Sequence, residues 1–295
     1  MRTLHIQHLT RYDYVQAVQT SLHLAHLTPR HDPLQSNLKC RWRIDPEPVE
    51  SREHRDYFGN QTLIFRVDQP HISLSVNLDF FVDRSVSSLS LPNVSWGDAD
   101  EVFQHHPHRL PPECWPCLPH STYTPHLEYL KKYALESFSA PRSMLVCCAE
   151  LMTRIHEDFK FDPTFSKVDT PLAEVFKHRK GVCQDFSHLM ISALRSLGCP
   201  ARYVSGYIET LPAPGKKKMV GADASHAWVS IFFPGYGWLD FDPTNNMTPS
   251  DRHISIASGR DYLDVSPLRG IFHGLSEHQL SVSVDVSEVL GPNRD

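Results

Sequence analysis

The chain of 295 residues lacks a long apolar run and a strong excess of charge of either sign. No stretch approaches the roughly 18 apolar residues that a membrane-spanning helix requires, and the first residues lack the apolar core of a signal peptide. We therefore expect a cytoplasmic protein with no membrane partner. The 29 Lys and Arg residues against 34 Asp and Glu residues leave a formal net charge of -5, which predicts no nucleic-acid partner. The basic triplet at residues 216–218 is predicted to be a solvated loop tip.

The sequence also lacks the paired cysteine pattern of a secreted, disulfide-stabilised protein. Its seven cysteines are an odd number, which predicts reduced thiols. One segment resembles a metal cluster by composition, because it holds His105, His106, His108, Cys114 and Cys117. No second Cys/His pair completes a zinc knuckle, however, and the segment does not begin a thioredoxin-like βαβ unit. We therefore predict a structural or incidental loop, with no metal and no cofactor.

Changes in residue pattern divide the chain into three regions. Residues 1–84 hold short runs of alternating apolar and polar side chains between turn residues, which predicts a β-sandwich-like N-terminal domain. Residues 85–124 are rich in Ser, Pro, His and Asp, and we interpret them as a linker or irregular connection. Residues 125–295 show helical patterns followed by strand patterns, which predicts helices packed on an antiparallel sheet. The predicted fold class is α+β.

Cys183 lies on the first turn of a strongly amphipathic predicted helix. Apolar residues recur at helical spacing from Phe186 to Leu197, and Gly198 marks the end of the helix. Backbone N–H groups and the helix dipole favour an anion at a helix start, so a thiolate is stabilised there. Gly181 lets the backbone approach this helix start closely. Cys183 is therefore predicted to be a reactive nucleophile.

The remaining cysteines lack such a setting, and we interpret them as small hydrophobic residues. Outside the His/Cys-rich segment they are Cys40, Cys147, Cys148 and Cys199. His188 follows Cys183 along the same predicted helix. We predict that it lies on the helix surface or supports the site from behind.

Two later predicted strands offer a histidine and two aspartates. His226 lies in an expected strand over residues 225–233, and Asp240 and Asp242 share one face of the next strand. A histidine and a carboxylate on neighbouring strands can meet, which is the orienting contact that a general base requires. Alternation cannot choose between the two aspartates. Asp242 precedes Pro243 at a strand end, a position that favours a cleft.

Three motifs in this order resemble those of the bacterial transglutaminase-like superfamily. They are residues 181–186, residues 226–228, and Trp238 with residues 242–244. Residues 12–14, 27–30, 56 and 58–60 resemble the N-terminal region found in many bacterial members, and residues 259–262 and 264–267 resemble their C-terminal segment. The resemblance implies a papain-like transglutaminase core. In it, Cys183 is the nucleophile, His226 the base and Asp242 the orienting acid, with Asp240 a bystander.

By this resemblance, we expect acyl transfer at an amide carbonyl through an acyl-enzyme. Gln184 stands where the protein-crosslinking animal enzymes have a tryptophan, and nothing resembles their calcium sites, so calcium-dependent crosslinking is not implied. We expect hydrolysis of a peptide or side-chain amide, with a peptide or protein as substrate. The alternatives are transamidation of a glutamine to an amine, a non-catalytic peptide-binding scaffold, and a thiol redox or metal protein built on Cys114 and Cys117.

Overall fold

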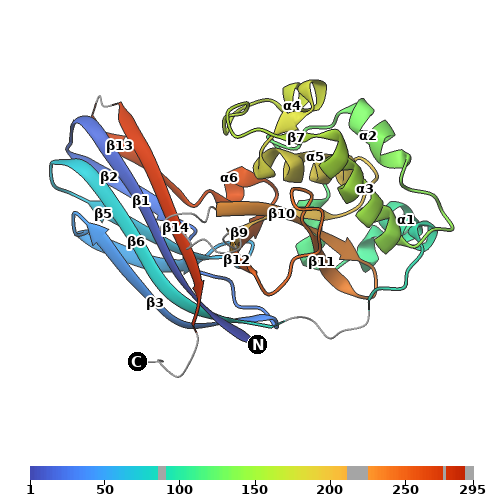
Figure 1. Cartoon of the computed structure of the whole chain (residues 1–295), viewed down its shortest axis with the longest axis horizontal. Helices are drawn as coiled ribbons and strands as arrows, with labels where there is room; N and C mark the ends of the chain where they lie inside the picture. Colours follow the sequence, from blue (N-terminus) through green and yellow to red (C-terminus); the bar gives the residue numbers. More distant parts are fainter. Residues whose placement is uncertain (86–90, 211–224, 275–276, 290–295) are drawn as a thin grey trace, which may run out of the picture.

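The computed structural model consists of an all-β region and a mixed region that lie side by side (Figure 1). It describes residues 1–85, 91–210, 225–274 and 277–289. The basic triplet at residues 216–218, predicted to be a loop tip, lies outside the described residues. Within those ranges, no helix is both long and apolar enough to cross a bilayer.

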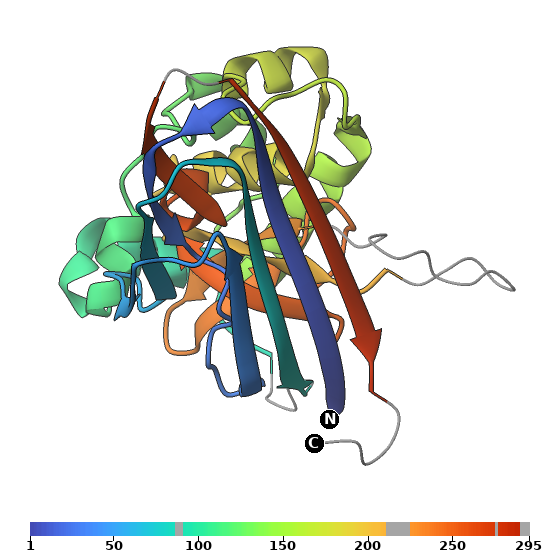
Figure 2. The same ribbon diagram turned by 90° about the vertical axis from the view of Figure 1, so that its left-hand side faces the viewer.

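Two four-stranded antiparallel sheets form the all-β region (Figures 1 and 2). Their strand orders are β14-β1-β6-β3 and β13-β2-β5-β4. The strands from the N-terminal region are β1 (Arg2–Val18), β2 (Thr20–Ala25), β3 (Gln35–Asp45), β4 (Glu50–Arg55), β5 (Gln61–Val67) and β6 (His71–Arg84). Strands β13 (Leu268–His273) and β14 (His278–Glu288) complete the two sheets.

Alternation of side chains explains how these sheets pack. Every second residue of β6 from Leu74 to Val82 is buried, and β5 buries Leu63, Phe65 and Val67. One buried face per strand is what a period of two produces. Each large apolar side chain contributes about 1.5–3 kcal/mol when it is fully buried. The predicted β-sandwich is confirmed.

The last two strands correct the predicted extent of the second domain over residues 125–295. β13 pairs with β2, and β14 pairs with β1 from Leu4 opposite Glu288 to Tyr14 opposite His278. These strands therefore belong to the sandwich. Strand pairing depends on which sheet edge is open in space, and the order of elements along the sequence does not reveal that.

The mixed region carries all the helices found among the described residues. They are α1 (Trp96–His105), α2 (Glu128–Leu135), α3 (Met144–Asp158), α4 (Leu172–His178), α5 (Cys183–Arg195) and α6 (Tyr262–Val265). Two 3₁₀ helices, η1 (Pro107–Arg109) and η2 (Pro112–Cys117), and a short parallel pair, β7 (Lys160–Phe161) with β8 (Lys180–Gly181), lie between them.

Helices α1, η1 and η2 correct the prediction that residues 85–124 form a linker or irregular connection. Ser95 caps α1 by accepting the Asp98 N–H at 3.1 Å. Trp96, Ala99 and Phe103 are buried, and their spacing gives the helix one apolar face. The prolines and histidines that follow hide this short pattern in the sequence. The segment is packed against the rest of the chain.

A four-stranded sheet in the order β11-β10-β9-β12 forms the centre of the mixed region. Its strands are β9 (Ala201–Ile208), β10 (Ser225–Phe233), β11 (Gly237–Phe241) and β12 (His253–Gly259). Helix α5 packs on β9 and β10 and is buried on all sides from Asp185 to Arg195. The predicted α+β class, with helices on an antiparallel sheet, is confirmed. The buried helix holds its own first turn firmly against β10.

Side-chain amides from the sandwich close the outer edge of β12. This strand ends its sheet, so its outward N–H and C=O groups have no strand partner there. Asn60 donates from Nδ2 to the Ser258 carbonyl at 2.9 Å and accepts the Ser258 N–H at 2.8 Å. Gln35 makes the same pair of bonds with Ser255, at 2.7 and 2.9 Å. Each amide therefore takes the place of a residue in a neighbouring strand.

A tight turn presents the Asn60 amide to β12. Asp56 Oδ1 accepts the N–H groups of Phe58 at 2.9 Å and of Asn60 at 2.7 Å. Gly59 adopts a φ of +77°, which favours glycine. Arg30 donates to the Phe58 carbonyl at 3.2 Å and also to Asn60 Oδ1. Residues from three of the segments that resemble the bacterial N-terminal region, 27–30, 56 and 58–60, thus build one contact between the sandwich and the mixed region.

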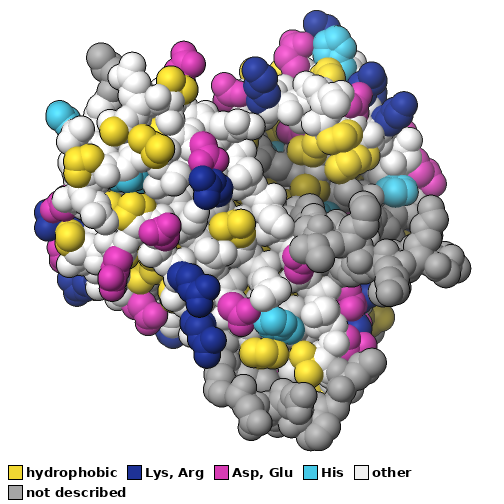
Figure 3. Space-filling view, turned by 60° about the vertical axis from the view of Figure 1, so that its left-hand side comes forward, with side chains coloured by type: hydrophobic (Ala, Val, Ile, Leu, Met, Phe, Trp, Pro, Cys, Tyr) yellow, Lys and Arg dark blue, Asp and Glu magenta, His cyan; other side chains and the backbone are white. Residues whose placement is uncertain are grey.

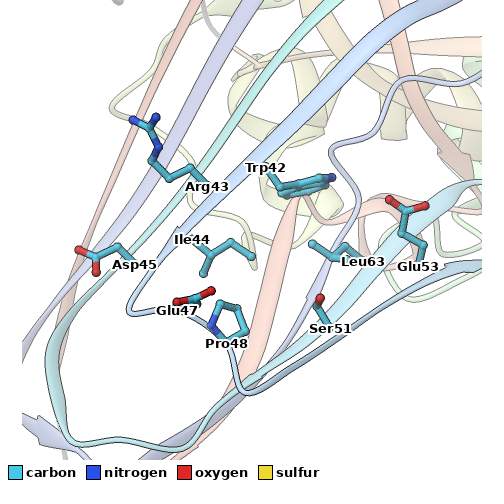
Figure 4. Close-up of a pocket in the computed structure, with 9 residues that line it drawn as sticks. All are labelled: Trp42, Arg43, Ile44, Asp45, Glu47, Pro48, Ser51, Glu53 and Leu63. Atoms are coloured by element: carbon cyan, nitrogen blue, oxygen red, sulfur yellow. The ribbon is translucent and has the colours of Figure 1, made fainter.

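An open cavity of about 540 Å³ lies between the sheet edges formed by β3 and β4 (Figure 4). The Trp42 ring lies next to Leu63 in the cavity, and Glu53 and Glu47 lie towards its opposite ends. None of the nine lining residues is Cys or His. The cavity lining therefore offers no thiol and no imidazole base.

Charged side chains of both signs are interspersed on the molecular surface. On the face shown in Figure 3, Lys and Arg alternate with Asp and Glu and with isolated apolar side chains. The described residues on this face form no continuous basic stripe of the kind that follows a nucleic-acid backbone.

We expect Asn60→Ala to lower the free energy of unfolding by about 2–4 kcal/mol, because it leaves two buried backbone groups of Ser258 without partners. The control is Gln7→Ala, which removes an exposed amide that donates to Asp79 at 3.0 Å. We expect a change within about 0.5 kcal/mol for the control. Denaturant unfolding of both variants checks this, and equal effects would contradict the edge-closing role of Asn60.

Candidate active site

Helix α5 begins with Cys183, which is half-buried. Asp185 caps the helix, because its Oδ2 accepts the Val182 N–H at 2.8 Å and the Ser166 hydroxyl at 2.5 Å. A Cβ atom at Gly181 would lie 2.7 Å from Asp185 Oδ2, so glycine is needed where the chain passes the cap. The free backbone N–H groups and the dipole of this helix start favour a negative charge beside the cysteine.

His226 on β10 lies between Cys183 and Asp242. Its Nε2 is 2.7 Å from Asp242 Oδ2, and the neighbouring Cys183 thiol raises the pKa of the ring. Because Nε2 is directed at the carboxylate, Nδ1 is the ring nitrogen left for the thiol. His226 is 8% exposed, and Asp242 is fully buried. The structure thus brings the three predicted site residues into one chain of contacts.

Asp240 takes a different partner, which resolves what residue alternation could not. Trp228 donates from Nε1 to Asp240 Oδ2 at 2.9 Å. The Trp228 ring lies over Gly206, where a Cβ atom would be 2.5 Å from it. The same ring lies 6.1 Å from the His226 ring. Asp240 therefore holds a tryptophan beside the histidine and does not touch the histidine itself.

Four further hydrogen bonds hold the Asp242 carboxylate. Oδ1 accepts the backbone N–H groups of Thr244 at 3.0 Å and Asn245 at 3.2 Å. Oδ2 accepts Asn245 Nδ2 at 2.7 Å and His253 Nε2 at 3.1 Å. Donors aimed at the charged form stabilise that form. The carboxylate is thereby kept ionised and fixed in orientation.

Two of these partners, His253 and Asn245, were not predicted from the sequence. The sequence Asp-Pro-Thr-Asn is a turn signal in which an aspartate accepts nearby N–H groups, and it could have pointed to Asn245. His253 begins β12, which pairs with β9 on the side away from β10. No local pattern indicates that its ring reaches the carboxylate after β11.

The charges of the pair follow from its contacts. Burial lowers the pKa of His226, but hydrogen bonds to Asp242 and Cys183 outweigh it and raise the pKa to about 10. Burial raises the pKa of Asp242, yet hydrogen bonds from His226 and His253 hold it well below its usual range. At neutral pH the pair is an imidazolium and a carboxylate. The stability contributed by the charged His226 is complete below its ordinary pKa of 6.5 and is lost as the pH rises through about 10.

The same residues form a compact set of metal-ligating groups. In the described part of the chain, His226, Asp242 and His253 are the one group of three whose ligand atoms all lie within 4.8 Å of one another. Both histidines, however, direct Nε2 at the same Asp242 oxygen, at 2.7 and 3.1 Å. An ion would need the lone pairs of these atoms, whereas hydrogen bonds to a carboxylate place N–H groups there. The donor set fits a hydrogen-bonded network.

The His/Cys-rich segment does not form such a group within the described residues. Cys114 and Cys117 on η2 are buried, and burial raises the pKa of both thiols. His105 and His106 lie at the end of α1, where they approach Glu101 at 4.0 and 3.5 Å. The two cysteines thus face the core, while the two histidines pair with a surface carboxylate.

Two predictions about single residues were wrong in part. His188 is not on the helix surface, because it is 2% exposed, stacks on Tyr123 and accepts the Tyr262 N–H at 3.2 Å. Cys40 is exposed, since β3 lies at a sheet edge, and it is not a buried hydrophobic residue. Cys147, Cys148 and Cys199 are buried, which agrees with their interpretation as small hydrophobic residues.

Comparisons with known proteins agree with this geometry. Residues 138–243 match the family model of the transglutaminase-like superfamily, and residues 4–83 match that of the bacterial transglutaminase-like N-terminal region. The first match includes Cys183, His226 and Asp242, and the second covers nearly all of β1 to β6.

Similar proteins extend the likeness over the whole chain. An uncharacterised protein of Mycobacterium tuberculosis is 37% identical over 288 residues, which are 95% of this chain and 91% of that protein. A protein-glutamine gamma-glutamyltransferase of Pseudomonas aeruginosa is 34% identical over 129 residues, which are 41% of this chain and 19% of the relative. The crystal structure of a Cytophaga hutchinsonii protein, described as a candidate cysteine protease, matches with a TM-score of 0.75 at 20% identity, over 99% of this chain and 92% of that one. The chain belongs to the bacterial transglutaminase-like superfamily.

Proposed function

We propose that the protein hydrolyses a peptide or side-chain amide through a cysteine acyl-enzyme. Membership of the transglutaminase-like superfamily supports cysteine-based acyl transfer in general. The observation that carries the assignment of residues is the position of His226, whose Nε2 lies 2.7 Å from Asp242 Oδ2 and whose ring interacts with the neighbouring Cys183 thiol. In this proposal Cys183 is the nucleophile, His226 the base and acid, and Asp242 the group that orients it.

Acylation begins when the Cys183 thiolate attacks the carbonyl carbon of the substrate. The electron pair of the C=O bond moves onto oxygen, where the backbone N–H of Cys183 is one stabilising donor. As the intermediate collapses, the C–N bond breaks and His226 gives its Nδ1 proton to the leaving amine. The products of this step are the free amine, a thioester and a neutral imidazole.

Deacylation reverses the proton transfer. Neutral His226 takes a proton from water while the water oxygen attacks the thioester carbon. The C–S bond then breaks, which releases a carboxylic acid and restores the thiolate and the imidazolium. Asp242 stays ionised throughout and stabilises the imidazolium, as a carboxylate does in a catalytic triad.

Water is the favoured acyl acceptor in this proposal because it is the most abundant nucleophile in the reduced cytoplasm where we place the enzyme. All seven cysteines are free thiols in the structure, in keeping with that location. Transamidation is the second candidate. It is favoured by the name of the Pseudomonas aeruginosa relative, whose similarity covers 41% of this chain. A non-catalytic scaffold is disfavoured, because it would not need an imidazolium beside a helix-start cysteine.

We expect iodoacetamide to label Cys183 about tenfold faster than any other cysteine near neutral pH, because the helix start and His226 favour its thiolate. The informative comparison is Cys40, which is exposed but lies within a strand. Timed labelling followed by mass mapping measures both sites in one sample. His226→Gln should slow labelling of Cys183 toward the rate of Cys40. Equal rates in the unmodified chain would argue against Cys183 as the nucleophile.

Asp242→Asn should lower turnover by about a thousandfold or more, the scale seen when a triad carboxylate becomes an amide. Asp240→Asn is the matched control, because an amide oxygen can still accept the Trp228 N–H. We expect it to keep turnover within about threefold of the unmodified chain. Acylation rates and thermal melts of both variants test this. A folded but inactive Asp240→Asn variant with an active Asp242→Asn variant would exchange the two assignments.

Partition of the acyl-enzyme tests the choice between water and an amine. A peptide-amide substrate is supplied with increasing concentrations of a primary amine, and mass spectrometry measures carboxylic acid and amide products. We expect the acid to predominate at millimolar amine, with no product from the Cys183→Ala variant. Predominance of the amide product would reject hydrolysis in favour of transamidation.

A further inference from the structure

We propose that His253 is a positioning residue that acts through Asp242 to set how readily His226 releases its proton. This inference rests on the proposed function, because the proton in question is the one given to the leaving amine. His253 comes from the edge strand β12 and is fully buried. Its side-chain hydrogen bonds go to the Ser250 N–H and to Asp242 Oδ2, so we infer that its effect passes through the carboxylate.

The hydrogen bonds of His253 fix its tautomer. The Ser250 N–H donates to His253 Nδ1 at 3.2 Å, so Nδ1 carries no proton. Nε2 is then the protonated nitrogen, and it donates to Asp242 Oδ2 at 3.1 Å. The Trp228 ring meets the His253 ring edge-on at 5.3 Å and closes its remaining side. His253 is therefore a neutral, rigidly held N–H donor.

The two histidines share one acceptor atom. His226 Nε2 lies 2.7 Å from Asp242 Oδ2, and His253 Nε2 lies 3.1 Å from the same oxygen. Each hydrogen bond to a carboxylate stabilises its charge and reduces its basicity. The bond from His253 therefore weakens the hold of Asp242 on the His226 imidazolium. Without His253, the imidazolium would be bound more tightly and would be a weaker acid toward the leaving amine.

The other groups around this network leave the direction of the effect unchanged. His226 faces Cys183 from α5 and Asp242 from the turn after β11, and His253 faces Asp242, His226 and the nearby Asp240. Burial lowers the pKa of His253, which keeps it neutral and adds no second positive charge beside His226. His253 thus contributes a dipole, and the net charge of the site is set by Cys183, His226 and Asp242.

The test compares two substrates whose acylation differs in its need for a proton. An amide requires protonation of its leaving amine, whereas a p-nitrophenyl ester does not. We expect His253→Leu to slow acylation by the amide about three- to tenfold, the scale of a change of about half to one unit in the pKa of His226. Acylation by the ester should stay within about twofold. Like His253→Leu, His253→Gln loses the hydrogen bond from the Ser250 N–H, but it keeps an N–H group for Asp242. Its rate of acylation by the amide should therefore equal that of the unmodified chain.

The control for a lost buried histidine is His8→Leu. His8 is 2% exposed, lies in β1 and hydrogen-bonds to Thr10 and Tyr207. It should lower the melting temperature without changing the ratio of amide to ester rates. A His253→Leu variant that slows both substrates equally, or neither, would overturn the proposal, because equal slowing is what misfolding of the site produces.

A measurement without substrate separates this inference from the proposed function. The His226 ring can be titrated by NMR, and its midpoint should rise above the value of the unmodified chain in His253→Leu and return in His253→Gln. An unchanged or lower midpoint would overturn the role of His253. A raised midpoint in a chain whose Cys183 is acylated by neither substrate would overturn the proposed function and leave the tuning by His253 standing.

Discussion

The buried negative charge of Asp242 is the constraint on which the arrangement around it depends. A carboxylate taken fully out of water is stable only when donors surround it. Here five N–H groups do so, from the backbone and side chain of the following turn and from two histidine rings. These donors belong to β10, β12 and the segment after β11. A strand shift that removed one of them would leave a buried charge without enough donors. The geometry of the site and the stability of the sheet therefore depend on the same hydrogen bonds.

The sandwich helps to maintain these hydrogen bonds because it holds β12, the strand that carries His253. Gln35 and Asn60 bind two backbone positions along β12, and Arg2 pairs with Glu209 at 3.0 Å just beyond β9. The Tyr207 hydroxyl hydrogen-bonds to His8 at 2.9 Å across the same interface. The all-β region thus fixes the position of the outer edge of the core sheet. Among its motif residues, Arg30, Asp56 and Asn60 are explained by this contact.

The sequence was sufficient where one periodic pattern decided the outcome. The stripe of α5 and the alternation in β10 and β6 predicted the helix, the strands and the approach of His226 to a carboxylate. The sequence was insufficient where the structure of a residue or segment depends on its neighbours in space. Asp240 and Asp242 share a face, and only the partners Trp228 and His226 distinguish them. The short stripe of α1 was masked by the prolines after it, and the pairing of β14 with β1 depends on an edge that no local pattern marks.

The pairing of the last strands with the first has a consequence for biosynthesis. β1 and β2 leave the ribosome early, yet the strands that cover one edge of each, β14 and β13, are made after the whole mixed region. Until then, two hydrogen-bonding edges stay open on the growing polypeptide, and neighbouring nascent chains can pair with such edges. Closing them requires a contact across nearly the full length of the chain, which is a slow step. The period of greatest exposure to misassembly therefore falls during translation, when the helices and the thiol can already be in place but the sandwich is still unsealed.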